Sequence, residues 1–158
     1  LFFYVTIPFI FYLRIFDFSE IIYKNHYIIP IVIISMIWIN DTASYILGML
    51  FGKQKAFPKI SPGKTWGGYI YGFIASILSI VIFWAIIKEV PLLHLILFSI
   101  ISFIFGSVGD LIESSLKRKA ELKDLSKILP GHGGVFDRFD SLIFALPFIT
   151  LLILTLYF

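Results

Sequence analysis

The sequence has 158 residues, is 59% hydrophobic and 18% aromatic, and has a mean hydropathy of +0.96. A soluble domain of this size needs more polar residues to cover its surface, so the composition favours an integral membrane protein. The sequence contains no cysteine, which excludes disulfides and cysteine-ligated metals. The net charge of +3 is modest and the basic residues lie beside apolar segments, so nucleic acid is not an expected partner.

Five apolar segments predict an all-α, polytopic membrane protein with about five transmembrane helices in a single domain. In chain order, the expected spans are residues 1–13, 28–51, 66–87, 91–112 and 139–158. The first is too short to span alone, and the sequence begins at Leu1 rather than Met. We therefore interpret the chain as the C-terminal part of a longer membrane protein. A mixed polar connection is expected over Arg14–Tyr27, and the fourth helix is expected to continue to Arg118.

The second expected span carries an acidic residue near its middle. Asp41 follows Asn40 and shares one helical face with Ser44, Tyr45 and Gly48. An acid within the membrane is costly, so Asp41 is a candidate functional residue. The alternative is a buried aspartate that hydrogen-bonds to neighbouring helices.

Basic residues gather in two connections between spans. Four lysines lie within residues 53–64, and six basic residues lie within residues 117–138. Because two spans separate these connections, both lie on one side of the membrane, which the positive-inside rule assigns to the cytoplasm.

The first basic connection, Lys53–Thr65, contains Pro58, Pro62 and Gly63 and is expected to be a loop rich in turns. It lacks the complete spacing of a phosphate-binding P-loop. Lys64 and Thr65 could still contact a nucleotide or lipid phosphate from a helix N-terminus. A simple interfacial turn is an equal alternative.

The end of the fourth helix carries charge on one face. Asp110, Glu113, Ser114, Lys117 and Arg118 fall at i, i+3, i+4, i+7 and i+8. Carboxylates followed by a hydroxyl and two cations suit a metal–nucleotide complex, because carboxylate oxygens bind hard cations and Lys or Arg binds phosphate. The alternative is a helix end with salt bridges at the membrane interface.

A further polar cluster precedes the last span. Asp137 and Asp140 lie one helical turn apart and follow the His132-Gly133-Gly134 segment, whose glycines let a ligand approach the backbone. These acids could take part in a phosphate and metal site. Alternatively, one of them caps the helix.

Together these residues resemble the CDP-diacylglycerol synthase family, also called the phosphatidate cytidylyltransferase family. Its signature is met by Ser114, Lys117-Arg118, Lys123-Asp124, Ser126, Leu129-Pro130, His132-Gly133-Gly134-Val135 and Asp137-Arg138-Phe139-Asp140. The resemblance runs from about Trp38 to the C-terminus. Gly67 departs from it, because the family often has Glu or Gln there.

The resemblance implies a transmembrane catalytic domain that converts CTP and phosphatidate to CDP-diacylglycerol and pyrophosphate. It implies Mg²⁺ on Asp110 and Asp137, with Asp41 and Asp140 as further ligands and a second cation, K⁺ being one candidate. The expected catalytic residues are Asp110, Asp137, Lys117 and Arg118. The expected substrate-binding residues are Lys64, Thr65, Ser114, Lys123, Asp124, His132, Gly133, Gly134 and Arg138.

CTP, phosphatidate and the lipid bilayer are thus the expected partners, with a homodimer through small-residue helix faces as a further expectation. The expected location is a bacterial inner or plasma membrane, with the site facing the cytoplasm. Three alternatives remain open. They are a CTP-dependent lipid kinase, a transporter or channel whose acids line an ion path, and a non-catalytic fragment.

Overall fold

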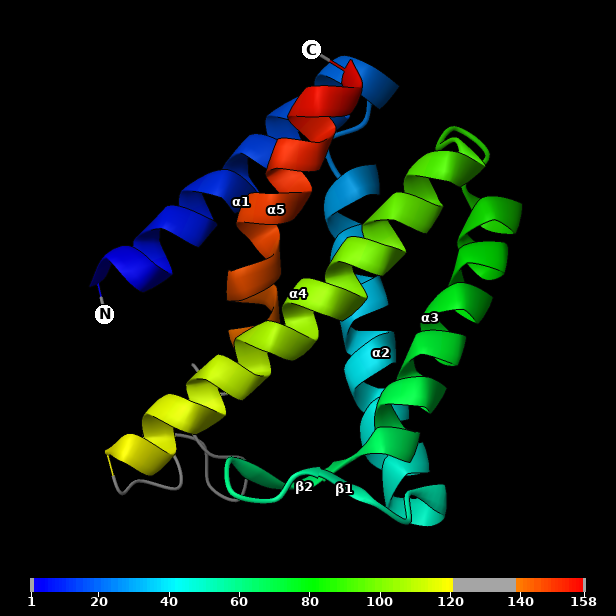
Figure 1. The fold of residues 1–158 in the computed structure, drawn as a ribbon. Coiled ribbons are helices and arrows are strands. Elements are labelled where there is room, and N and C mark those ends of the chain that lie inside the picture. The colour runs from blue at the N-terminus through cyan, green and yellow to red at the C-terminus, as the bar shows by residue number, and fades with distance from the viewer. Residues whose placement is uncertain (1, 121–138, 158) are drawn as a thin grey trace, which may run out of the picture.

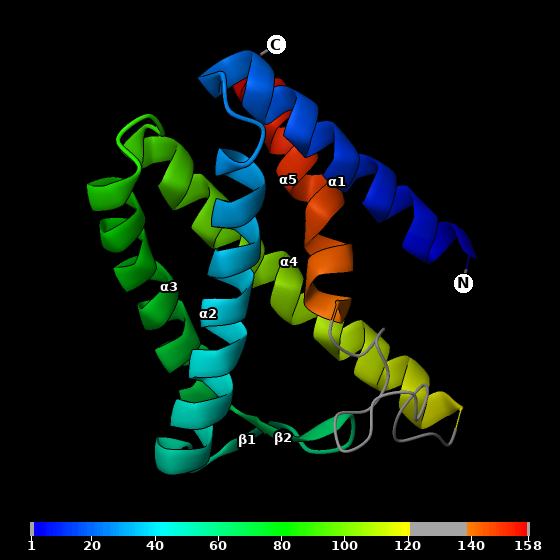
Figure 2. The same cartoon turned by 180° about the vertical axis from the view of Figure 1, so that it is seen from behind.

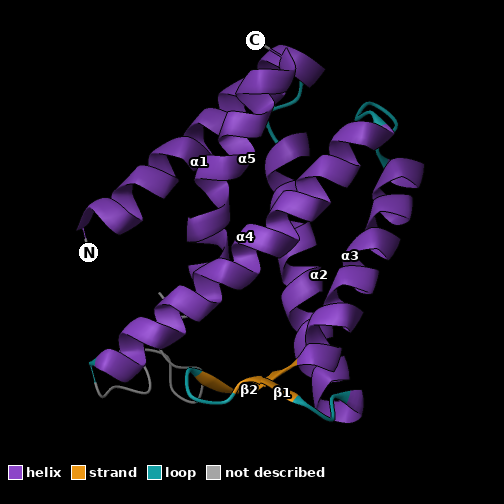
Figure 3. Cartoon of the chain, viewed as in Figure 1, coloured by secondary structure: helices purple, strands orange, loops and turns teal. Residues whose placement is uncertain are grey.

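The computed structural model describes residues 2–120 and 139–157. Its elements are α1 (Phe2–Tyr23), α2 (Ile28–Phe51), β1 (Lys55–Phe57), β2 (Ser61–Thr65), α3 (Trp66–Ile86), α4 (Leu92–Lys119) and α5 (Asp140–Tyr157). Figures 1 and 3 show the helices as a bundle with one small hairpin at its end. Within the described residues, α2, α3, α4 and α5 are long and apolar enough to cross a membrane. The expected all-α, polytopic membrane fold is confirmed.

The first helix is longer than expected. The polar connection predicted from Arg14 is wrong, because α1 continues as helix to Tyr23. Its charged residues lie on the exposed side, while Ile15 and Ser19 are fully buried. The Ser19 hydroxyl accepts a hydrogen bond from the backbone N–H of Ile29 at 3.2 Å, which ties α1 to the start of α2. The charged residues of this segment thus lie on the exposed side of a packed helix and do not interrupt it.

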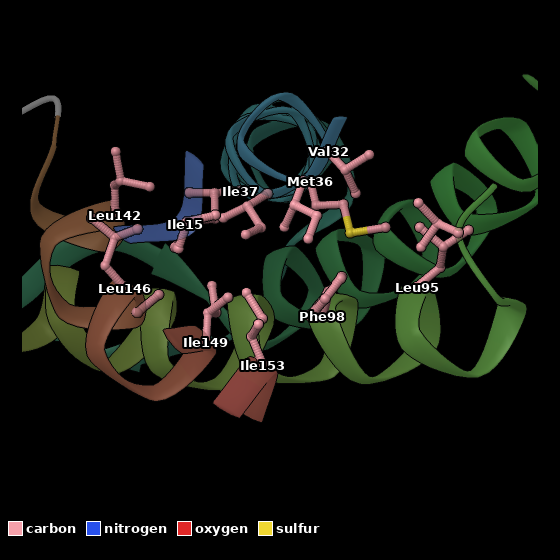
Figure 4. Close-up of a cluster of buried hydrophobic side chains, with 14 of the residues drawn as sticks. Ile15, Val32, Met36, Ile37, Leu95, Phe98, Leu142, Leu146, Ile149 and Ile153 are labelled. Carbon is pink, nitrogen blue, oxygen red and sulfur yellow. The ribbon is translucent and has the colours of Figure 1, made fainter. Parts of the chain in front are cut away.

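The apolar core lies between α1, α2, α4 and α5. Figure 4 shows its side chains converging from these helices, including Ile15, Met36, Phe98 and Ile149. In both Figure 1 and Figure 2, α1 runs beside α5, and α2 runs beside α3. Lipid tails are as apolar as these side chains, so close packing rather than escape from water holds such helices together.

Small residues bring α2 and α3 into close contact. A Cβ atom on Gly68 would lie 2.7 Å from the carbonyl oxygen of Ser44, and one on Gly72 would overlap the Ser44 hydroxyl. Gly48 lies against Gly68 in the same way, since its Cβ would lie 2.9 Å from the Gly68 Cα. The approach places the polar face of α2 directly beside the start of α3.

The basic connection between α2 and α3 is an ordered hairpin, not the expected irregular loop. Strands β1 and β2 are antiparallel, with Lys55 opposite Thr65 and Phe57 opposite Ser61. Thr65 ends β2 and caps α3, because its side chain accepts a hydrogen bond from the Gly68 N–H at 3.0 Å. Figure 1 shows the hairpin crossing from the base of α2 and α3 toward the C-terminal end of α4.

The opposite end of the bundle carries the α1–α2 and α3–α4 turns and the end of α5 (Figure 1). There the side chains of Tyr23, His94 and Tyr157 meet in a polar cluster that joins α1, α4 and α5. The described basic connection, Lys53–Thr65, therefore lies at one end of the bundle and these turns lie at the other.

Candidate functional site

A pocket of about 250 Å³ lies at the hairpin end of the bundle. Four separate segments form it, which makes it a tertiary feature rather than a property of one motif. Its lining residues are Asn40, Asp41, Ser44 and Tyr45 of α2, Ser61, Gly63, Lys64 and Thr65 of β2, Gly68 and Tyr69 of α3, and Ser107 and Asp110 of α4. The structure thus brings together three residues that the sequence singled out separately, Asp41, Lys64 and Asp110.

An ion pair between Lys64 and Asp110 spans this pocket. Their side chains are 22% and 28% exposed, so both charges are largely removed from water. Burial acts to lower the pKa of Lys64, but Asp110, Tyr69 and Asp41 together outweigh the effect of burial, and the pKa is raised. The Lys64 ammonium also lies 5.6 Å from the centre of the Tyr69 ring, a cation–π contact. Lys64 is therefore a protonated cation held at the pocket wall.

Asp41 of α2 lines the same pocket as Asp110. Its neighbour Asn40 is buried and donates a hydrogen bond from Nδ2 to Asp41 Oδ1 at 3.2 Å. The Asn40 Oδ1 atom has no hydrogen-bond partner among the described residues. Asp110 and Asp140 lie near enough to Asp41 to repel its negative charge. Several carboxylates thus converge here, and Lys64 is the cation that offsets them.

The C-terminal turns of α4 hold their charged residues in defined contacts. Ser114 Oγ donates a hydrogen bond to Asp110 Oδ1 at 3.3 Å, and Lys117 Nζ lies 3.0 Å from Oε1 of the buried Glu113. Arg118 Nε donates to the Ile60 carbonyl oxygen at 3.3 Å and so connects α4 to the hairpin. The charged residues predicted on one face of α4 thus make contacts with one another. Lys117 and Arg118 also stabilise the local structure through these contacts.

Thr65 has a structural role that the sequence left as an alternative. Its hydroxyl accepts from the Gly68 N–H and donates to the Gly48 carbonyl oxygen at 3.3 Å. Because Thr65 is only 4% exposed and its hydroxyl is already used, it joins α2, β2 and α3 rather than offering a free donor. Substrate binding by Thr65 stays a prediction.

Of the remaining predicted site residues, only Asp140 lies within the described part of the chain. Asp140 begins α5, and its carboxylate accepts a hydrogen bond from the Ser141 N–H at 2.7 Å. Seven others fall outside the described residues, so their predicted roles stay predictions: Lys123, Asp124, His132, Gly133, Gly134, Asp137 and Arg138.

Metal ligation needs donors that the described residues supply only in part. Within residues 2–120 and 139–157, no group of three His, Asp or Glu side chains could hold a metal ion. Mg²⁺, however, is commonly bound by one or two carboxylates together with substrate phosphates. Asp41 and Asp110 line the same pocket and offer such carboxylates, so the donor set fits this mode of binding.

Tyr69 and Asn40 are among the pocket residues that the sequence did not assign to a site. Tyr69 lines the pocket from α3, and its hydroxyl is buried. Asn40 was noted only as the neighbour of Asp41. No spacing in the sequence signals either role, because each depends on the close approach of α2 and α3.

The fold and the site define a polytopic helical membrane protein with a charged pocket at one end of its bundle. Residues 1–156 match the model of the cytidylyltransferase family, and the chain belongs to that family.

Similar proteins include three phosphatidate cytidylyltransferases. That of Staphylococcus haemolyticus (strain JCSC1435) is 45% identical over 130 residues, which cover 82% of this chain and 49% of the relative. That of Bacillus subtilis (strain 168) is 41% identical over 119 residues, covering 75% and 44%. That of Staphylococcus aureus (strain COL) is 40% identical over 130 residues, covering 82% and 49%. The chain spans about half the length of the relatives it matches.

Proposed function

We propose that the protein containing this chain transfers the cytidylyl group of CTP to phosphatidate, giving CDP-diacylglycerol and pyrophosphate. The observation that carries the proposal is the pocket in which Asp41, Lys64 and Asp110 meet at the hairpin end of the bundle. The names of the similar proteins support the same reaction.

In this reaction an oxygen of the phosphatidate phosphate bonds to the α-phosphorus of CTP, and the bond to pyrophosphate breaks. Such transfers depend mainly on positioning and on neutralising negative charge. Lys64 would bind a phosphate oxygen from the pocket wall. Ser114, Lys117 and Arg118 lie on α4, the helix that carries Asp110, and would assist it. The phosphatidate phosphate is largely ionised near neutral pH, so the attack needs no dedicated general base.

Asp110 and Asp41 would hold Mg²⁺, which when bound neutralises charge on the phosphate oxygens. Asp137 and Asp140 are proposed as further ligands of Mg²⁺. We also propose that the site binds a second cation, such as K⁺. Lys123, Asp124, His132, Gly133, Gly134 and Arg138 are proposed to contact the substrates. Asn40 orients Asp41 through its hydrogen bond, as partners of metal ligands commonly do.

The two substrates suit the location of the pocket. CTP is water-soluble and phosphatidate lies in the membrane, so the reaction needs a site at the boundary between them. The lysines of the hairpin support a cytoplasmic orientation of this boundary, and the similar proteins come from bacteria. A homodimer through small-residue helix faces remains part of the proposal.

A CTP-dependent lipid kinase is the nearest alternative, and it would transfer the γ-phosphate rather than the cytidylyl group. A transporter is less well supported, because ion paths need polar groups through the depth of the membrane. Here Asp41, Lys64 and Asp110 line one pocket beside the hairpin.

The test uses the protein as encoded, purified in detergent with phosphatidate, Mg²⁺ and CTP labelled either in cytidine or at the γ-phosphate. We expect cytidine label in the lipid phase, loss of transfer with EDTA, and loss in Asp110→Asn. Asp17→Asn, which changes an exposed acid of α1, is the matched control and should retain activity. Lipid labelled only from the γ-phosphate would identify a kinase, and no labelled lipid would contradict both enzymes.

A further inference from the structure

The hairpin segment, residues 53–65, carries lysines on two sides. Lys64 points into the pocket, whereas Lys53, Lys55 and Lys59 are exposed. None of these three exposed lysines forms an ion pair with an acid within residues 2–120 and 139–157. Their charge therefore faces outward, next to a pocket wall formed by the same short segment.

Aromatic residues indicate the depth at which this segment would lie in a membrane. Trp66 is the first residue of α3 and is 52% exposed. Its ring lies 5.8 Å from that of Phe57 in β1 and 6.2 Å from that of Tyr69. Exposed Trp at the start of a membrane span is typical of the lipid headgroup layer. The exposed lysines therefore lie at headgroup depth rather than out in bulk water.

The hairpin segment is also fixed relative to the pocket. The backbone N–H of Trp66 donates to the Gln54 carbonyl oxygen at 3.1 Å, and Arg118 Nε of α4 donates to the Ile60 carbonyl oxygen at 3.3 Å. The ion pair of Lys64 with Asp110 adds a third tie. A headgroup bound at Lys59 would thus sit beside the strand whose Ser61 and Gly63 line the pocket.

We infer that Lys53, Lys55 and Lys59 form a docking surface for anionic lipid headgroups, which concentrates lipid beside the pocket. Clustered lysines next to a membrane span attract anionic lipids, and the attraction weakens with salt. The benefit to catalysis rests on the proposed function, because phosphatidate is itself an anionic lipid. The enrichment of anionic lipid does not depend on that function and can be measured separately.

The first experiment measures which lipids surround the hairpin. The protein as encoded is placed in nanodiscs, with every tryptophan except Trp66 replaced by Phe. Lipids brominated near the headgroup, either phosphatidylglycerol or phosphatidylcholine, then quench Trp66 fluorescence. At low salt we expect the anionic lipid to quench at least about threefold more strongly at equal mole fraction. The ratio should approach about one at high salt, where the attraction is screened.

Variants separate the docking surface from a general effect of charge. K53Q/K55Q/K59Q should lose the preference for the anionic lipid, while K53R/K55R/K59R should keep it and shows that the segment still folds. The matched control is K88Q, which removes an exposed lysine from the opposite end of the bundle and should leave the ratio unchanged. An equal ratio for native protein and K53Q/K55Q/K59Q would overturn the inference.

The second experiment tests the link to catalysis. In K53Q/K55Q/K59Q we expect the surface mole fraction of phosphatidate for half-maximal rate to rise about threefold or more, with the KM for CTP unchanged. A raised KM for CTP instead would show that the lysines bind the nucleotide, which contradicts lipid docking. If the native protein transfers no cytidylyl group, the proposed function fails, and the quenching experiment alone decides the docking surface.

Discussion

Lys64 and Asp110 are the residues whose pairing most defines the site. Both side chains are less than one third exposed, so each charge depends on the other in the absence of ligand. Removing one partner of such a pair leaves a poorly solvated charge behind, whereas removing both does not.

Replacing Lys64 with Met should therefore destabilise the protein by up to about 3 kcal/mol, because Asp110 is left unpaired. K64M/D110N should recover part of that loss, since the Asp110 charge that Lys64 paired with is removed as well. Both variants should lose about 100-fold or more in kcat/KM, because the proposed phosphate-binding cation is gone. Thermal melting in detergent and transfer assays measure the two effects, with K88M as control. Normal activity in K64M would contradict the assigned role.

The Lys64 ion pair also predicts how stability depends on pH. Folding raises the pKa of Lys64, so its stabilising contribution is complete below the pKa of the unfolded chain and is lost as pH rises through the folded value. The stability difference between native protein and K64M should stay constant from neutral pH to about pH 9 and shrink above about pH 10. A difference that shrinks already near neutral pH would contradict a charged Lys64.

Asn40 should matter through Asp41. Asn40→Leu keeps a similar size but removes the donor to Asp41 Oδ1, so we expect kcat/KM to fall about 10-fold or more. The matched control is Ser99→Ala, which removes a buried hydroxyl that has no partner among the described residues. Retained activity in Asn40→Leu, alongside a normal melting temperature, would show that Asp41 needs no such support.

At this scale, sequence reasoning identified the charged residues but not their partners. Asp41, Lys64 and Asp110 stand out because charges are rare in so apolar a sequence. Tyr69 and Asn40 do not, because their roles arise only when α2 and α3 approach each other. For Thr65 the sequence left two interpretations open, and the structure shows that its hydroxyl caps α3.

At the scale of elements, the contact between α2 and α3 positions the pocket. Gly72→Ala should destabilise the protein by about 1–3 kcal/mol, because the added methyl group would overlap Ser44 Oγ. Gly106→Ala in α4 is the matched control. Its Cβ would meet Ser141 Cβ at an ordinary 3.5 Å, so this change should be neutral or stabilising. Equal melting temperatures for the two variants would contradict the tight contact.

Helices were predicted better than the segments between them. Long apolar runs fixed α2 to α5 to within a few residues, because a bilayer demands hydrogen-bonded helix of a certain length. The hairpin was missed because β1 has only three residues and β2 contains Pro62 and Gly63. Its pairing depends on anchoring by Arg118 and Asp110, which are distant in sequence. The second half of α1 was missed because polar residues on its exposed side resembled a loop.

At the scale of the whole molecule, the charge distribution predicts the orientation in the membrane. The native sequence has no cysteine, so single cysteines can report on each end. In intact cells, a membrane-impermeant maleimide should label K88C, at the α3–α4 turn, but not K59C in the hairpin. After permeabilisation both should react, because both positions are exposed. Labelling of K59C in intact cells would place the hairpin outside and contradict the proposed orientation.

The sequence predicted the class of fold, because hydropathy alone limits such a protein to a helical bundle. Which helices pack together, with α1 beside α5 and α2 beside α3, could not be predicted from the sequence. Every helix offers several apolar faces, and the choice among them depends on local fits such as the glycine contacts of α2 and α3.

The Lys64–Asp110 contact makes each residue the other's counter-ion in the ligand-free protein. A cation entering alone would gain Asp110 but deprive Lys64 of its ion-pair partner, and an anion entering alone would gain Lys64 but deprive Asp110 of its partner. Arriving together, the two ligands satisfy both residues. Their binding is therefore thermodynamically linked, and each should raise the affinity of the site for the other by the same factor.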